Sequence, residues 1–206
     1  MTLWYRSCWR KLAFRSSSSN PFSSVRGQSS SSSLAGSLLL AHPALRDPNF
    51  KRAVVLMSAH NDDGAMGVVL NRPLKKKLGD LKGPLALGPL SAAPVFNGGP
   101  VQTDQLILVA WQVRDDGFRL HFGIDPEKAG ELLAEEGTDV RAFMGYSGWS
   151  AGQLENELTS QTWIVTEAPG DLFSQPSGDE LWSASLRREG DDWRLLADEP
   201  EHPEQN

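Results

Sequence analysis

Cysteine is almost absent, with Cys8 alone among 206 residues. A single cysteine forms no intramolecular disulfide and supplies no cysteine-based zinc site, which fits a reducing compartment such as the cytoplasm. Long apolar runs are missing too, because the longest candidate, 34–41, is interrupted by Gly36 and Ser37. A membrane-spanning helix needs about 20 apolar residues. The sequence therefore predicts neither a disulfide framework nor a membrane span.

Acidic residues are missing from the first 46 positions, which hold six basic ones: Arg6, Arg10, Lys11, Arg15, Arg26 and Arg46. The whole chain has 20 basic and 26 acidic residues and a net charge of −6. Removing those six leaves 14 basic against 26 acidic residues from Asp47 onward, a net charge of −12. A surface of that sign repels phosphate backbones unless its basic residues are clustered. General nucleic-acid binding is therefore disfavoured.

Composition divides the chain into three segments. Residues 1–33 are rich in Ser and Arg and contain two serine runs, so we predict a disordered leader. The same composition is typical of an organellar transit peptide, and that alternative to a cytoplasmic protein stays open. Residues 34–197 are predicted to form a single domain, and the acidic residues 198–206 a frayed tail.

Short apolar runs separated by turn residues predict mostly antiparallel strands. Residues 52–59 and 65–70 flank a turn of Asn, Asp and Gly and predict a hairpin. Residues 106–111 and 118–122 flank an Asp-Gly pair and predict a second one. Pro73 is expected to end strand pairing, and residues 73–93 to form a loose loop with at most a short helix. Residues 38–41 form another short apolar run, and further strands are predicted at 140–146 and 163–166.

Helices are predicted after three N-terminal signals. Asp125 followed by Pro126 supplies an N-cap and a proline at the first helical position. Ser150 with Gln153, and Ser177 with Glu180, have the spacing of capping boxes. Helices interspersed among antiparallel hairpins indicate an α+β protein of one domain.

The residue patterns of common enzymes are incomplete or missing. Gly145-Tyr146-Ser147-Gly148-Trp149 departs from the nucleophile elbow at Trp149, so a tight strand-to-helix turn with a buried Trp149 is preferred. The four histidines are scattered without the spacing of metal ligands, and no phosphate-binding glycine motif occurs. We therefore predict no catalytic residues, no metal and no cofactor. Asn97-Gly98-Gly99 suits an ordinary turn better than a backbone anion site.

Polar residues at the ends of predicted strands form the candidate binding surface: His60, Asn71, Arg72, Asn97, Gly98, Tyr146 and Gln153. Arg72 has two interpretations. Its guanidinium either braces the fold through local acids or recognises an anion on a partner, and bracing is preferred. The basic cluster Lys75–Lys77 is interpreted as a solvated loop, and alternatively as a contact for nucleic acid.

Several segments in order resemble the AlgH-like family, also called YqgE-like: 36–43, 47–50, 54–56, 64–73, 97–101, 145–149 and 152–155. The resemblance covers residues 34 to 188. It implies a mixed, mostly antiparallel, bent or barrel-like sheet flanked by helices, and a non-catalytic regulatory or binding protein with an unidentified protein or small-molecule partner. The alternatives are an enzyme that uses His60 as acid or base with Arg72 as an anion clamp, and nucleic-acid binding through Lys75–Lys77.

Overall fold

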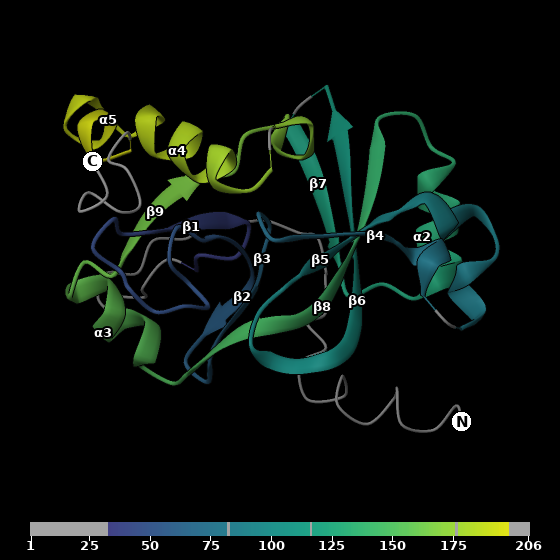
Figure 1. Ribbon diagram of the computed structural model, residues 1–206, viewed down its shortest axis with the longest axis horizontal. Coiled ribbons are helices and arrows are strands. Elements are labelled where there is room, and N and C mark those ends of the chain that lie inside the picture. Colours follow the sequence, from purple (N-terminus) through teal and green to yellow (C-terminus); the bar gives the residue numbers. More distant parts are fainter. Residues whose placement is uncertain (1–32, 82, 116, 176, 198–206) are drawn as a thin grey trace, which may run out of the picture. The chain divides into compact units, whose positions relative to one another are not determined.

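The computed structural model describes residues 33–81, 83–115, 117–175 and 177–197 (Figure 1). The predicted leader, apart from Ser33, and the predicted tail 198–206 lie outside the described residues. The described residues all belong to one unit that begins at Ser33.

Nine strands form one open, mixed sheet in the order β4-β5-β8-β3-β2-β1-β9, with β6 paired to β8 and β7 paired to β6. The only parallel pair among them is β5 with β8. The strands are β1 (Ser37–Ala41), β2 (Val54–Asn61), β3 (Gly64–Val69), β4 (Pro73–Lys77), β5 (Pro94–Asn97), β6 (Val101–Arg114), β7 (Gly117–Phe122), β8 (Thr138–Ser150) and β9 (Trp163–Glu167).

Strand β8 joins the two parts of the sheet. Residues 138–146 of β8 pair with β6, and residues 142–144 pair with β5. Residues 147–150 continue beyond β5 and pair with β3, which leads to β2, β1 and β9. A single long strand therefore places the ends of β3 and β5 next to each other, although they are far apart in the sequence.

Four α-helices and four short 3-10 helices cover the sheet in the described ranges. They are α2 (Pro126–Leu133), α3 (Gln153–Thr159), α4 (Asp179–Arg188) and α5 (Asp191–Ala197), with η1 (Leu78–Asp80), η2 (Pro84–Ala86), η3 (Pro89–Ala92) and η4 (Leu172–Ser174). Figure 1 shows α4 and α5 on one side of β1 and β9 and α3 on the other. None of the helices in these ranges has the length and apolar character that crossing a membrane requires.

Both faces of β1 are buried, because successive side chains of a strand point to opposite faces. Leu38 and Leu40 pack in the cluster that includes Trp182 and Leu186 of α4. Leu39 and Ala41 pack on the opposite face, in the cluster that includes Leu154 of α3. A third cluster lies between α2 and strands β5, β6 and β8. The α+β fold with a mixed, mostly antiparallel sheet flanked by helices is thus confirmed, and the sheet is open and not closed into a barrel.

Both predicted hairpins form, as β2 with β3 and as β6 with β7. The helix predicted after Asp125 is α2, where the Asp125 carboxylate accepts a hydrogen bond from the backbone N–H of Lys128 at 2.8 Å. Trp149 is 6% exposed, which confirms that it is a core residue.

The prediction that Pro73 ends strand pairing is wrong. Pro73 is the first residue of β4 and lies opposite Phe96 of β5. β4 is an edge strand, and proline is tolerated at the first residue of such a strand, where its missing N–H is not needed. The segment 73–93 is therefore a strand followed by three 3-10 helices instead of a loose loop.

The turn predicted at Gly145–Trp149 is wrong as well, because these residues continue β8. Gly145 has φ +70°, and the pairing of β6 with β8 shifts register between Val101 and Leu106. The glycine thus marks an irregularity within a strand. Ser147 is fully buried there and donates a hydrogen bond to the carbonyl oxygen of Gly98.

The two capping boxes are formed incompletely or not at all. Helix α3 begins at Gln153, directly after Gly152. The side-chain oxygen of Gln153 accepts a hydrogen bond from the backbone N–H of Ser150 at 3.1 Å. Helix α4 begins at Asp179 after Gly178, without a side-chain cap. In both helices the N-cap residue is a glycine with a positive φ, a backbone conformation that glycine adopts without steric cost.

Candidate functional site

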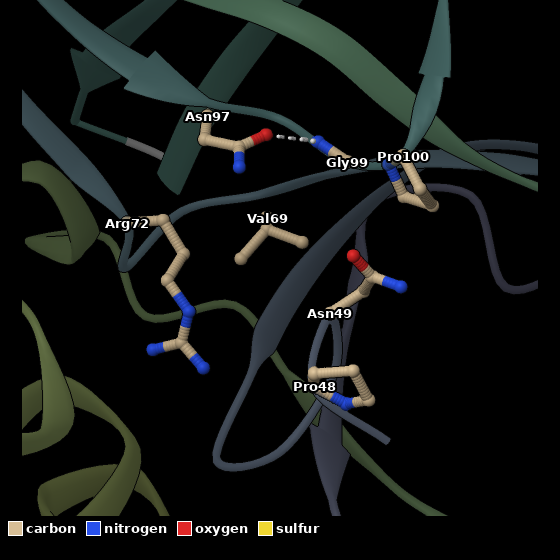
Figure 2. A pocket seen from close by; sticks show the side chains of 7 residues that line it. All are labelled: Pro48, Asn49, Val69, Arg72, Asn97, Gly99 and Pro100. Carbon is tan, nitrogen blue, oxygen red and sulfur yellow. Dashed lines mark hydrogen bonds between the residues drawn. The ribbon is translucent and has the colours of Figure 1, made fainter. Parts of the chain in front are cut away.

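A pocket of about 170 Å³ lies where the ends of β3 and β5 meet the loop before β2. Figure 2 shows Val69 at its centre, between Arg72 on one side and Asn49 on the other. The pocket is lined by Pro48, Asn49, Val69, Arg72, Asn97, Gly99 and Pro100. One cation and two amide side chains line it, and none of the seven lining residues is acidic.

Arg72 is held in place at the edge of this pocket. One terminal nitrogen of its guanidinium donates to the backbone carbonyl of Lys51, and the other lies 3.5 Å from a carboxylate oxygen of Asp179. Its side chain is 29% exposed. The carbonyl of Arg72 accepts from the backbone N–H of Asn97 at 2.8 Å. Arg72 and Asn97 are therefore fixed next to each other by the backbone.

The loop 97–100 forms the upper wall of the pocket in Figure 2. The Asn97 side-chain oxygen accepts from the backbone N–H of Gly99 at 3.2 Å, which leaves the amide nitrogen of Asn97 toward the pocket. The Gly98 N–H donates to the carbonyl of Met144 at 2.8 Å. Both glycine N–H groups have partners within the chain, so neither is free to bind an anion.

The opposite wall is the turn of Pro48 and Asn49. The Asp47 carboxylate accepts from the backbone N–H groups of Asn49 and Phe50, and its carbonyl accepts from Lys51. Phe50 anchors the turn, because its ring packs against Trp149 and Trp163 with centroids 6.4 and 5.5 Å away. The pocket wall is therefore attached to a buried aromatic cluster.

That aromatic cluster has one shared acceptor. The indole nitrogens of Trp149 and Trp163 donate to the same carboxylate oxygen of Glu157, at 2.8 and 2.7 Å. The other oxygen of Glu157 accepts from the Gln153 amide at 2.9 Å. Gln153, a predicted site residue, thus supports α3 and this cluster and does not line the pocket.

Asn71 is 1% exposed and its side chain makes three hydrogen bonds. Its oxygen accepts from the N–H of Val54 at 3.0 Å, and its nitrogen donates to the carbonyls of Arg52 and Gly178 at 2.8 and 3.0 Å. Asn71 is therefore a buried structural residue and does not line the pocket. It joins the start of β2 to the start of α4.

His60 lies at the other end of β2 and does not line the pocket. Its Nδ1 accepts from the backbone N–H of Leu34 at 3.2 Å, so the proton of the neutral ring is on Nε2, which donates to Glu155 at 2.7 Å. The hydrogen bond from His60 is the main cause of a lowered pKa of the Glu155 carboxyl. Both ring nitrogens of His60 have partners within the chain.

The remaining predicted site residues lie in or beside the sheet. Tyr146 is half-buried in β8, opposite Val101, and packs against the core cluster that contains Phe143. Lys75, Lys76 and Lys77 are exposed on the edge strand β4. Within the described part of the chain, no three His, Cys, Asp or Glu side chains are grouped as metal ligands would be.

The sequence of residues 38–194 matches the AlgH-like family model, DUF179. The chain belongs to the AlgH-like family. A UPF0301 protein of Streptomyces coelicolor is 43% identical over 196 residues, which span 88% of this chain and 100% of that protein. A UPF0301 protein of Chlorobium limicola is 34% identical over 180 residues, or 82% of this chain and 93% of the relative.

Two solved structures have a similar fold. The solution structure of the AlgH protein from Pseudomonas aeruginosa has a TM-score of 0.59 and 34% identity, and covers 86% of this chain and 100% of its own. A crystal structure of a protein from Corynebacterium diphtheriae has a TM-score of 0.62 at 24% identity, and covers 79% of this chain and 90% of its own. The first match agrees with the family and both confirm the fold.

The structure brings together two of the predicted site residues, Arg72 and Asn97, in one pocket. The sequence prediction missed Pro48 and Asn49. They belong to the Asp47-Pro48-Asn49-Phe50 segment that carries part of the family resemblance, and this was the available signal. Their loop lies beside the ends of β3 and β5 only in the folded chain.

Proposed function

We propose that this AlgH-like protein is a non-catalytic binding protein that recognises a carboxylate group in the Arg72 pocket. The observation that carries the proposal is a held guanidinium facing a pocket that is also lined by the amides of Asn49 and Asn97 and by no acid. Arginine presents a planar set of donors that matches a carboxylate, and the amides add further N–H donors.

A binding role fits this lining better than catalysis does. None of the seven lining side chains is a nucleophile or a general acid or base, since they are prolines, asparagines, valine, glycine and arginine. The pocket volume of about 170 Å³ is below the roughly 300–1,000 Å³ of pockets that hold drug-sized ligands. A small acid, or the carboxylate end of a protein segment, is of that size.

The proposal is tested by titrating the ¹⁵N-labelled full chain with succinate at constant ionic strength, with neutral succinamide as the matched control. We expect succinate, but not succinamide, to shift the signals of the Gly99 backbone amide and of the Asn49 and Asn97 side-chain amides. Arg72→Lys should weaken binding by about tenfold or more, because hydrogen bonds to charged groups contribute about 1.5–3 kcal/mol. Arg114→Lys, at the end of β6 that lies farther along the strand from Pro100, should bind as the wild type does.

Equal shifts from succinate and succinamide would contradict the proposal. A peptide with a free C-terminal carboxylate, compared with its amidated form, distinguishes the two sources of the ligand. Tighter binding of the free-acid peptide than of succinate indicates a protein partner, and the reverse order indicates a small molecule.

We infer that such binding serves a regulatory role in the cytoplasm, which agrees with the single cysteine of the chain. Import into an organelle is the alternative if residues 1–33 direct it. Imaging of the tagged full chain in its own cell, compared with a chain that lacks residues 1–33, distinguishes the two. Cytoplasmic signal from both forms supports the inference.

A further inference from the structure

Asp179, the first residue of α4, is shared between two arginines. One oxygen lies 3.4 Å from a terminal nitrogen of Arg52, and the other lies 3.5 Å from a terminal nitrogen of Arg72. The Asp179 side chain is half exposed, and Asp179 does not line the pocket itself. Asp179 therefore contacts the guanidinium of Arg72 without lining the pocket that Arg72 lines.

We propose that Asp179 is an internal competitor of the ligand, a carboxylate that occupies a donor of Arg72 until a carboxylate ligand enters the pocket. This inference rests on the proposed function and names the residue that sets the affinity of that site. A guanidinium has five N–H donors, and those that face Lys51 and Asp179 are not available to a ligand at the same time. A bound ligand carboxylate and Asp179 also repel each other across a few ångströms.

Release of Asp179 from Arg72 costs little. Asp179 is half exposed and Arg72 partly exposed, ion pairs open to solvent contribute weakly, and Asp179 keeps its contact with Arg52 after the exchange. Helix α4 does not depend on the Arg72 contact, because Leu181, Trp182 and Leu186 bury its inner face. Its start is also tied by the hydrogen bond from Asn71 to the Gly178 carbonyl. The expected change is thus confined to the Asp179 side chain and the first turn of α4.

The direction of one mutational effect separates this inference from a supporting role. If Asp179 only steadies Arg72, then Asp179→Asn loosens the guanidinium and weakens ligand binding. If Asp179 competes, Asp179→Asn frees a donor, removes a like charge and tightens binding. We expect succinate to bind about two- to fivefold more tightly to Asp179→Asn, the range set by the strength of an exposed ion pair.

The experiment measures succinate affinity of the full chain by NMR titration at constant ionic strength for the wild type, Asp179→Asn and Glu127→Gln. Glu127→Gln removes an acid from the first turn of another helix, α2, and controls for net charge. Tighter binding by Asp179→Asn alone supports the inference. Equal tightening by Glu127→Gln overturns it, because the effect is then one of overall charge.

The two proposals fail in different ways. Wild-type binding that depends on Arg72, together with unchanged or weaker binding by Asp179→Asn, overturns the competitor role and leaves the binding function standing. Absence of succinate binding in the wild type and in Asp179→Asn overturns both. In the wild type, signals of the first turn of α4 should also shift with succinate, and signals that stay fixed at saturation contradict the displacement of Asp179.

Discussion

Trp149 and Trp163 are joined through one atom, because the indole nitrogens of both donate to the same carboxylate oxygen of Glu157. The two rings meet edge to face with centroids 5.9 Å apart, and both contact Phe50. Phe50 follows Pro48 and Asn49, which line the pocket. An acid on α3 therefore helps to position the loop that forms one wall of the candidate site.

Replacement of Glu157 by Leu should lower the free energy of unfolding by about 2–6 kcal/mol, because two indole N–H groups lose their acceptor at about 1–3 kcal/mol each. Glu157→Gln keeps a carbonyl oxygen and should cost about 1 kcal/mol. Urea denaturation followed by tryptophan fluorescence measures both. Equal losses for the two variants would show that the charge matters and the shared acceptor does not.

Asn71→Ala should cost about 2–4 kcal/mol, since it leaves the Val54 N–H and two carbonyls without their buried partner. Asn97→Ala is the matched control. Asn97 is exposed and makes one hydrogen bond to a nearby backbone N–H, so its loss should cost about 1 kcal/mol or less. Denaturant midpoints of the two variants decide the point, and comparable destabilisation would refute the assignment of Asn71 as a buried structural residue.

Gly99→Ala should destabilise the chain by about 1–3 kcal/mol more than Gly88→Ala does. Both glycines have a positive φ, +148° and +111°, so both substitutions introduce backbone strain. A methyl group added at Gly99 would overlap the backbone of Tyr146. A methyl group added at Gly88 would have no atom of the described residues within 4 Å. Thermal unfolding of the two variants isolates the steric contribution, and equal midpoints would show that β8 can move aside.

The contact between His60 and Glu155 should make stability depend on pH in acid. The hydrogen bond from His60 lowers the pKa of Glu155 from its ordinary value of 4.5, so the contact stabilises the fold above pH 4.5. Its contribution is lost as the pH falls through the lowered pKa. We expect the stability difference between wild type and Glu155→Gln to shrink below pH 4.5 and to vanish in a His60→Ala background. A difference that persists in that background would contradict the contact.

We expect the exposed lysines of β4 to bind neither RNA nor DNA measurably at about 0.15 M salt, where charges are screened beyond about 8 Å. The net charge of −12 from Asp47 onward opposes phosphate binding. Fluorescence anisotropy with labelled RNA and DNA tests this over a salt series. Micromolar binding that weakens with salt and is lost on replacing Lys75, Lys76 and Lys77 by Ala would overturn the expectation and support the nucleic-acid alternative.

Local sequence alone determined several elements of this fold. The β2–β3 and β6–β7 hairpins follow from short apolar runs around Asn, Asp and Gly, and α2 begins at Pro126 directly after its N-cap residue Asp125. These signals succeed because each depends on residues that are neighbours in the chain. The prediction at Pro73 failed because its outcome depends on whether β4 lies at the edge of the sheet, which is a property of the whole topology.

Only the tertiary structure decided which polar residues meet. His60 lies beside the turn of the β2–β3 hairpin and Arg72 follows its open end. His60 contacts Glu155 of α3, whereas Arg72 lies with Asn49 and Asn97 in the pocket. The β2 backbone separates them, because its two ends lie far apart along an extended strand. Sequence marked Arg72 and Asn97 as polar groups at strand ends. Long-range pairing of β8 with both β3 and β5 put them beside the loop of Asn49, and no local pattern encodes that pairing.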